Sequence, residues 1–416
     1  MIDPRDRFFT EGQCYFGPSD DPTTPAFCDI WDWDRLQVVN LRGTAKVFPL
    51  DEDLEIQTLA NLADHLSPKV YAISVDDDGL LTSASTDPKD DRSLFIAYLP
   101  FSMCPSLASC RTVPYSQLKE IDRLGPGVDL SSYKDESGIS QKVAFKFNPL
   151  QKPMRLQMAW DELHILKSLP PHPNIVPFDR VVLDDGDVVP RVLGFTTKYI
   201  PGGTLEDPNM PFQFQWLQQL TQLVDFLNLE LGIMHQDIAP RNLLFDPEAN
   251  RILLFDFDRT AVGKKYLSEG RDDVSAVVFT LYELITNDNH FATIPHWERP
   301  IDLVQSITDW IPTRKLDADV STFRNYLNEW VATRKANEVQ DMERYLNAPK
   351  RDLFTLPDLP IPPDYSVPFE HGTTANGEKN FMTGVRSRRT AMELGQYCFR
   401  WERPLQSRLL KEAKNN

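Results

Sequence analysis

The pattern of hydrophobic and polar positions predicts a strand-rich part of the chain followed by a helix-rich part. Short apolar runs occur at 69–75 and 93–101, separated by the polar stretch 76–92. Apolar runs of this length with Gly, Pro and Asp around them are typical of β-strands. We therefore expect two strands joined by a loop or hairpin. Residues 1–115, which contain these runs, are interpreted as an N-terminal accessory segment or domain without a recognisable motif.

Strand and helix patterns alternate in the next segment, 116–200. Strands are expected at 118–125 and 141–147, a helix at 154–169 and two strands within 181–200. In the predicted helix the apolar residues lie approximately on one face, and Pro170 ends the helix. The segment therefore reads as a β-rich lobe with one helix.

Helical patterns dominate from about residue 205 to 345. The first is 214–231, which ends before Gly232 as helices often do. We therefore predict an α+β fold class with two lobes, a β-rich lobe at 116–200 and an α-helical lobe at 201–345. Together they form one domain, 116–345.

The last part, 346–416, is predicted to be a C-terminal extension. Proline and glycine recur through 354–380 and predict no regular element there. Residues 389–416 have a helix-forming, basic and amphipathic composition.

Charge limits the partners. Of 416 residues, 61 are acidic and 44 basic, a formal net charge of −17 that is spread along the chain. A field of this sign repels nucleic acid and anionic lipid surfaces, so we expect neither nucleic acid nor a membrane as a partner.

The cysteines and the apolar runs indicate the compartment. The five cysteines are widely spaced and include no CxxC pair, which favours reduced thiols. The first residues carry charge where a signal peptide is apolar, and the longest strongly apolar run, 274–285, is too short to span a bilayer. We expect a cytoplasmic location, with the nucleus as the alternative.

The most informative motif is a polar run between two apolar stretches, "IMHQDIAPRNLLFD" at 233–246. His235, Asp237 and Asn242 fit H-x-D-x-x-x-x-N, which resembles the catalytic loop of protein kinases and their small-molecule kinase relatives. Asp237 can accept the proton of an attacking hydroxyl, and the amide oxygen of Asn242 can bind Mg²⁺.

A second acidic motif follows at a matching distance. Asp256, Phe257 and Asp258 follow the apolar strand "RILLF", fourteen residues after Asn242 (256 − 242). A hairpin would bring Asp256 beside Asn242, where its carboxylate would complete a magnesium site.

The upstream lobe supplies a lysine and a glutamate. "VAFK" resembles the kinase V-A-I-K strand, and this resemblance makes Lys146 the contact to the α- and β-phosphates of ATP. Glu162, on the following predicted helix, would be its counter-charge, because an ammonium in a half-buried strand needs one.

These motifs resemble the protein-kinase-like superfamily over residues 120 to about 290, and in detail its divergent fungal members. The resemblance implies a hinge at "GFTTKYI", an adenine site and an aspartate, Asp273, that holds the catalytic loop. The nucleotide-binding residues it implies are Leu124, Gly125, Gly127, Ala144, Lys146, Thr197, Lys198, Tyr199, Ile200 and Leu244. Leu166, Phe257 and His235 would form a packed column between the lobes.

The sequence departs from the family pattern at several positions. The phosphate-covering loop should read G-x-G-x-x-G, but Leu130 occupies the third glycine position. Gln236 replaces the arginine that pairs with an activation-loop phosphate in many kinases, and only 14 residues separate Asp258 from Asp273 (273 − 258 − 1). Regulation by phosphorylation of that loop is therefore not expected.

Two further departures concern the acceptor. Asp258, in place of glycine, resembles aminoglycoside and choline kinases, whereas Arg241 resembles the loop of tyrosine kinases. The resulting hypothesis is an ATP- and Mg²⁺-dependent kinase with Asp237, Lys146, Glu162 and Arg241 as catalytic residues, and Asn242 and Asp256 as metal ligands. The favoured acceptor is a protein Ser, Thr or Tyr hydroxyl. The alternatives are a small-molecule hydroxyl, or a nucleotide-binding pseudokinase that acts as a scaffold.

Overall fold

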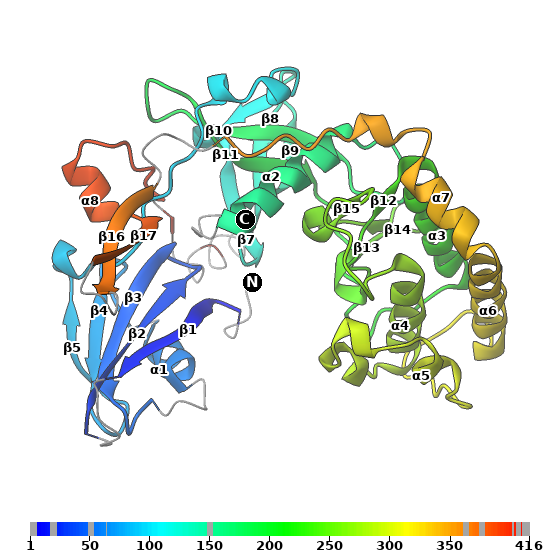
Figure 1. The fold of residues 1–416 in the computed structure, drawn as a ribbon, viewed down its shortest axis with the longest axis horizontal. Helices are drawn as coiled ribbons and strands as arrows, with labels where there is room; N and C mark the ends of the chain where they lie inside the picture. Colours follow the sequence, from blue (N-terminus) through cyan, green and yellow to red (C-terminus); the bar gives the residue numbers. More distant parts are fainter. Residues whose placement is uncertain are drawn as a thin grey trace. The chain divides into compact units, whose positions relative to one another are not determined.

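The computed structural model divides the chain into two compact units. The described residues are 6–16, 23–48, 54–63, 65–147, 153–360, 366–373, 379–401, 403–404 and 409. Unit 1 comprises residues 1–156, 180–196 and 359–416, and unit 2 comprises residues 157–179 and 197–358. The C-terminal extension from residue 359 therefore belongs to the same unit as the N-terminal segment. Figure 1 draws the elements in the colours of the sequence.

A five-stranded sheet with one helix forms the first part of unit 1. Its strand order is β1-β2-β3-β4-β5. The bounds are β1 Phe8–Phe16, β2 Pro25–Asp32, β3 Gln37–Thr44, α1 Leu54–Ala63, β4 Ala72–Val75 and β5 Leu81–Ser85. Because β3 and β4 are parallel, α1 lies in the crossover between them. Alternate residues such as Ile30, Val39 and Leu41 face one core, which Leu59 of α1 completes.

One of the two strands expected in this segment is present. The strand predicted at 69–75 is confirmed as β4. The strand predicted at 93–101 is wrong: Leu94 and Pro100 make only isolated bridges there. Phe95, Tyr98 and Leu99 of this run are buried, but the backbone pairs at these two points instead of along a ladder.

A six-stranded sheet forms the second part of unit 1, with β10 and β11 reaching into unit 2. Its order is β6-β10-β11-β9-β8-β7. The bounds are β6 Thr112–Pro114, β7 Lys119–Gly125, β8 Val128–Lys134, β9 Ser140–Phe147, β10 Phe178–Asp184 and β11 Arg191–Lys198. The strands predicted at 118–125 and 141–147 and the two within 181–200 are confirmed.

An aromatic core joins the N-terminal segment, the six-stranded sheet and the C-terminal extension. Trp33, which follows β2, packs with Phe147 of β9, and Trp401 of the extension packs against this core. The ring centroids of Phe147 and Trp401 are 4.6 Å apart. Unit 1 is therefore held together by residues from both ends of the chain.

The C-terminal extension contains a hairpin that was not expected. β16 (Ser366–Thr373) and β17 (Lys379–Val385) pair antiparallel, so the prediction of no regular element in 354–380 is wrong for these residues. Proline is tolerated here because each strand of a two-stranded sheet is an edge strand. The helix expected at 389–416 is confirmed only as α8 (Arg388–Glu393), and residues 394–401 are not helical.

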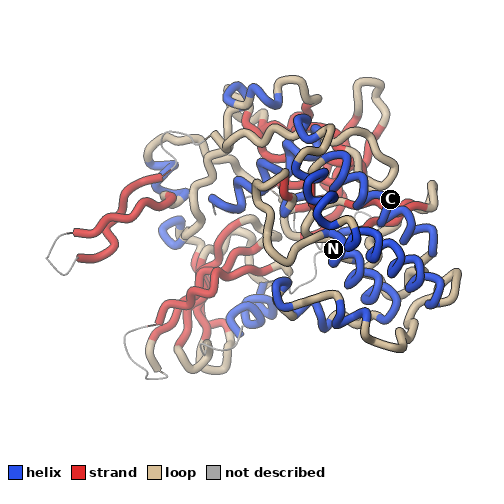
Figure 2. Tube along the Cα trace, turned by 45° about the vertical axis from the view of Figure 1, so that its right-hand side comes forward, coloured by secondary structure: helices blue, strands red, loops and turns tan. Residues whose placement is uncertain are grey.

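Helices, blue in Figure 2, are the main regular elements of unit 2. Their bounds are α2 Pro153–Ser168, which enters the unit at residue 157, α3 Phe214–Asp225, α4 Asp273–Thr286, α5 Asp302–Gln305, α6 Val320–Ala336 and α7 Glu338–Leu346. A π-helical segment continues α3 to Leu231, and Gly232 ends it with φ +67°. The predicted α+β class and the helices predicted at 154–169 and 214–231 are confirmed. No helix of the described residues is long and apolar enough to cross a membrane.

The expectation of five reduced cysteines is wrong for Cys28, which is disulfide-bonded. Antiparallel pairing of β1 and β2 places the backbone of Cys14 opposite Cys28. Cys104, Cys110 and Cys398 are not disulfide-bonded. The spacing of cysteines along the chain does not reveal which positions strand register brings together.

Candidate functional site

The polar run 235–242 lies between two short strands of unit 2. β12 (Ile233–Met234) precedes it and β13 (Leu243–Asp246) follows. Gln236 has φ +63°, a left-handed conformation that is unfavourable for a residue with a side chain. The surrounding structure must therefore hold this turn in place.

Asp273, the first residue of α4, holds the turn at two points. Its carboxylate accepts the backbone N–H of His235 at 2.9 Å and that of Gln236 at 2.8 Å. It also accepts the amide of Asn228 at 2.8 Å and is 0% exposed. Burial raises the pKa of Asp273, and these donors act in the opposite direction. The geometry thus gives Asp273 the loop-holding part that the resemblance implies.

Asp237 is oriented by the two polar residues that follow it. One carboxylate oxygen accepts from Arg241 at 2.6 Å, and the other accepts from the amide nitrogen of Asn242 at 3.0 Å. Burial lowers the pKa of Arg241, but the nearby carboxylates, Asp237 above all, together raise it by more, so the net pKa is raised and the guanidinium stays charged. With 18% of its side chain exposed, Asp237 is accessible to a reacting group.

Asn242 has a donor side and an acceptor side with different tasks. Its amide nitrogen also donates to the backbone oxygen of Asp237 at 2.7 Å. Because the nitrogen is used for Asp237, the amide oxygen is the group that can bind a cation, and amide oxygens suit Mg²⁺.

His235 has a structural task. It is 0% exposed, and its Nδ1 accepts the backbone N–H of Asp237 at 3.3 Å. Its Nε2 therefore carries the proton and donates to the carbonyl of Phe255 at 3.0 Å. The ring also meets Phe257 edge to face, with centroids 4.8 Å apart. The histidine thus packs and orients the loop.

The predicted hairpin between the two acidic motifs is present. β13 pairs antiparallel with β14 (Arg251–Leu254), and the N–H of Phe255 donates to the carbonyl of Asn242 at 3.2 Å. Asp256 follows directly, with the left-handed φ of +64°. The hairpin therefore brings the backbone of the two predicted metal ligands close together.

Glu162 reaches the same region from α2. Its carboxylate accepts the backbone N–H of Phe257 at 3.2 Å, and both residues are almost completely buried, at 1% and 0% exposed. Unit 2 thus brings Glu162, Asp237, Asn242 and the backbone of Asp256 into one connected arrangement.

The predicted nucleotide-binding residues divide between the units. Ile200 and Leu244 share one hydrophobic cluster in unit 2, and Thr197, Lys198 and Tyr199 precede it. Leu124, Gly125, Gly127, Ala144 and Lys146 lie in unit 1. Within that unit Lys146 on β9 is the register partner of Val128, and Ala144 that of Leu130. A joint role of the two sets in one site stays a prediction.

The glycine motif forms a tight turn. Gly125 pairs with Val128, so only Pro126 and Gly127 lie between the strands. Gly127 has φ +69°, and a Cβ there would lie 2.6 Å from the backbone oxygen of Phe147. Proline followed by a glycine with positive φ is typical of a type II turn. The turn itself therefore requires this glycine.

Sequence reasoning missed the task of Gln236. Its side-chain nitrogen donates to the carbonyls of Arg259 at 2.7 Å and Tyr266 at 2.9 Å, and its oxygen accepts the N–H of Ser268 at 2.7 Å. A neutral amide therefore holds the segment between Asp258 and Asp273. The available signal was that glutamine, unlike the arginine it replaces, offers an acceptor as well as donors.

Known proteins similar to this chain are kinases. No family model matches the chain. Over 163 residues it is 33% identical to the serine/threonine-protein kinase SBK1 of Mus musculus. This alignment covers 37% of this chain and 37% of that kinase. Over 119 residues it is 29% identical to casein kinase II subunit alpha' of Saccharomyces cerevisiae, covering 28% of this chain and 34% of that one. Over 219 residues it is 28% identical to a probable serine/threonine-protein kinase of Dictyostelium discoideum, covering 50% and 23%.

These similarities and the geometry of the loop place the chain in the protein-kinase-like superfamily, as the motifs predict. The alignments span between 23% and 37% of the length of these three relatives. The fold class of a bilobal, α+β kinase-like chain is thereby confirmed, while membership of a fungal subgroup stays a prediction.

Proposed function

We propose that the chain is an ATP- and Mg²⁺-dependent phosphotransferase of the protein kinase type, which transfers the γ-phosphoryl group to a hydroxyl. The observation that carries the proposal is the arrangement of Asp237, whose two carboxylate oxygens are held by Arg241 and Asn242 beside the hairpin that leads to Asp256. Such an arrangement suits phosphoryl transfer, in which positioning and charge neutralisation do most of the work.

In the proposed reaction Asp237 accepts the proton of the acceptor hydroxyl while the hydroxyl oxygen bonds to the γ-phosphorus. The bond from that phosphorus to the β,γ-bridging oxygen breaks, and ADP leaves with the electron pair. Arg241 keeps the carboxylate of Asp237 aimed.

The remaining predicted residues would bind the nucleotide. Asn242 and Asp256 offer oxygen ligands of the type that Mg²⁺ prefers, and a bound Mg²⁺ would neutralise phosphate charge. Lys146 would contact the α- and β-phosphates with Glu162 as its counter-charge. The adenine would lie between Leu124, Ala144 and Leu244, against the backbone of 198–200 behind Thr197.

We favour a protein Ser or Thr hydroxyl as acceptor, because the similar proteins are named serine/threonine-protein kinases. The competing acceptor is a small-molecule hydroxyl, favoured by the short segment between Asp258 and Asp273, which offers little surface for an extended peptide. Transfer of radiolabelled phosphate to a peptide library or to a set of amino alcohols separates the two.

ATP turnover by wild type and by Asp237→Asn tests the proposal. We expect the variant to lose about 10²–10⁴-fold in turnover, because it cannot accept the proton. Equal turnover by both proteins would contradict the role of Asp237. A thermal-shift titration with Mg²⁺ and ATP tests the scaffold alternative, which the tight glycine turn and Leu130 favour: stabilisation without turnover would support a nucleotide-binding pseudokinase.

The proposed location is the cytoplasm or the nucleus. The disulfide at Cys28 argues against a reducing compartment, where disulfides are rare. Mass spectrometry of the alkylated protein isolated from its cell decides: a reduced Cys28 would support the proposed location.

A further inference from the structure

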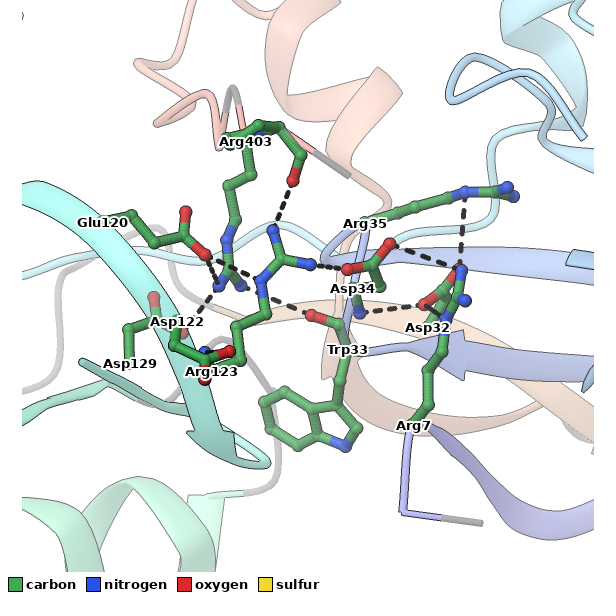
Figure 3. Close-up of polar contacts among 11 residues, drawn as sticks. Arg7, Asp32, Trp33, Asp34, Arg35, Glu120, Asp122, Arg123, Asp129 and Arg403 are labelled. Carbon is green, nitrogen blue, oxygen red and sulfur yellow. Dashed lines mark hydrogen bonds and ion pairs between the residues drawn. The ribbon is translucent and has the colours of Figure 1, made fainter. Parts of the chain in front are cut away.

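Four arginines and four carboxylates form a buried cluster in unit 1, close to the glycine turn 124–128 (Figure 3). The members of this arginine cluster are Arg7, Asp32, Asp34, Arg35, Glu120, Arg123, Asp129 and Arg403. The guanidinium of Arg123 and the carboxylate of Asp32 are both 0% exposed. Ions are buried at acceptable cost only when they are paired, so each member depends on the others.

Arg123 and Asp129 stand on either side of the glycine turn. They are register partners on β7 and β8, and the five residues 124–128 connect them. Arg123 pairs with Asp34, which follows β2 of the N-terminal sheet, and its Nε lies 2.7 Å from Glu120. The base of the turn is therefore fastened to the N-terminal segment.

Arg403, from the C-terminal extension, fastens the opposite strand. Its Nη2 lies 2.6 Å from Asp129 on β8 and 2.9 Å from Glu120 on β7. Its Nη1 donates to the backbone oxygen of Trp33 at 3.4 Å. The neighbouring carbonyl of Pro404 accepts from Arg123. One arginine thus links both strands of the hairpin to the N-terminal segment.

The aromatic side chains of Trp33 and Phe147 connect the arginine cluster and the glycine turn to the strand that carries Lys146. A Cβ added at Gly127 would lie 3.5 Å from Cζ3 of Trp33, so the indole lies against the turn. The guanidinium of Arg403 lies over the ring of Phe147, 5.4 Å from its centroid. Phe147 follows Lys146 on β9, and its N–H donates to the carbonyl of Gly127 at 2.9 Å.

Burial makes the ionised forms in the cluster dependent on their partners. It raises the pKa of Asp129, and Arg403 is the strongest influence in the opposite direction. It also lowers the pKa of Arg123. Loss of Arg403 would therefore leave the buried carboxylate of Asp129, at the base of the turn, with only the attraction of Arg123.

We propose that the N-terminal segment and the C-terminal extension position the glycine turn and Lys146 for the phosphates of ATP, with Asp34 and Arg403 as positioning residues. This inference rests on the proposed function. It assigns a task to both extensions: without them the turn that is expected to contact phosphate loses the ion pairs at its base and is held by the sheet alone.

The test compares full-length Arg403→Gln with Arg403→Lys and with a surface control. Arg42→Gln is the matched control, because Arg42 pairs with Asp90 at 2.6 Å in the same unit but is 43% exposed. The KM for ATP, kcat and the hydrogen exchange of amides 124–134 are measured well below the melting temperature.

We expect Arg403→Gln to raise the KM for ATP about tenfold with a smaller change in kcat, and to speed exchange in the turn. Arg403→Lys, which keeps the charge but not the fork of donors, should give an intermediate KM. If Arg403→Gln does not fold, the lysine variant decides alone. Wild-type KM and exchange in a folded variant would overturn the inference. Absence of ATP binding in the wild type would instead end the proposed function, while the exchange data would still report on the turn.

Discussion

Replacement of Gln236 by alanine should release the segment between Asp258 and Asp273. The side chain, in a residue 5% exposed, makes three hydrogen bonds to that segment, and alanine removes all of them. At about 1 kcal/mol each they stabilise the closed segment by about 3 kcal/mol. Because each 1.4 kcal/mol changes an equilibrium constant tenfold, the equilibrium constant for local opening of the segment should rise roughly 100-fold.

Hydrogen exchange of amides 259–272 measures this opening directly. We expect faster exchange in Gln236→Ala, above all at the amide of Ser268, which loses its acceptor. Turnover should fall together with the ordered fraction of the segment. Gln215→Ala is a suitable control, because Gln215 is an exposed glutamine of the same unit.

Unchanged exchange in a folded Gln236→Ala protein would refute the reasoning. A second readout uses phosphatase. If a neutral amide alone orders the segment, treatment of wild-type protein with phosphatase should leave its turnover unchanged. A large loss of turnover would show that a phosphate contributes, contrary to the contacts of Gln236.

Three further changes have defined outcomes. His164 is 1% exposed, and burial lowers its pKa to about 4, compared with about 6.5 in the unfolded chain. The unfolded chain therefore binds a proton first as the pH falls. The contribution of neutral His164 to the free energy of unfolding is complete above pH ~6.5 and is lost as the pH falls toward 4. Urea titrations should show up to about 3 kcal/mol of this loss, and His164→Gln should remove that dependence. Asp273→Asn should cost about 2–4 kcal/mol in the same assay, because its amide nitrogen would face a backbone donor, and an unchanged midpoint would contradict this. Gly127→Ala should lower the melting temperature through its positive φ and its contact with Phe147, whereas Gly125→Ala, with open space around it, should not; equal effects would be inconsistent with the turn geometry.

The catalytic loop could be predicted from sequence because its information is local. His235, Asp237 and Asn242 lie within eight consecutive residues, and the short hairpin of β13 and β14 brings Asp256 to them. Turn residues and apolar runs are sufficient to locate such a hairpin. The helix that carries Glu162 was equally clear from its stripe and its terminal proline.

Features that depend on distant contacts could not be predicted. Nothing near Arg403 indicates that it meets Asp129, because the pair forms only when the sheet and the extension pack together. The same holds for Gln236, whose importance depends on three backbone groups 23 to 32 positions away. The strand prediction at 93–101 failed for a related reason. Phe95, Tyr98 and Leu99 are buried by distant parts of the chain although their backbone forms no strand.

The arginine cluster has a consequence for synthesis on the ribosome. Arg123 emerges 280 residues before Arg403 (403 − 123), and the continuous stretch 197–358 of unit 2 is made in between. Since domains tend to fold as they emerge, the helical unit can reach its native state first, while Asp129 of the nascent six-stranded sheet still lacks the guanidinium of Arg403. Completion of unit 1 would then be a late event in folding, and until then Trp33 would lack its contacts with the C-terminal extension.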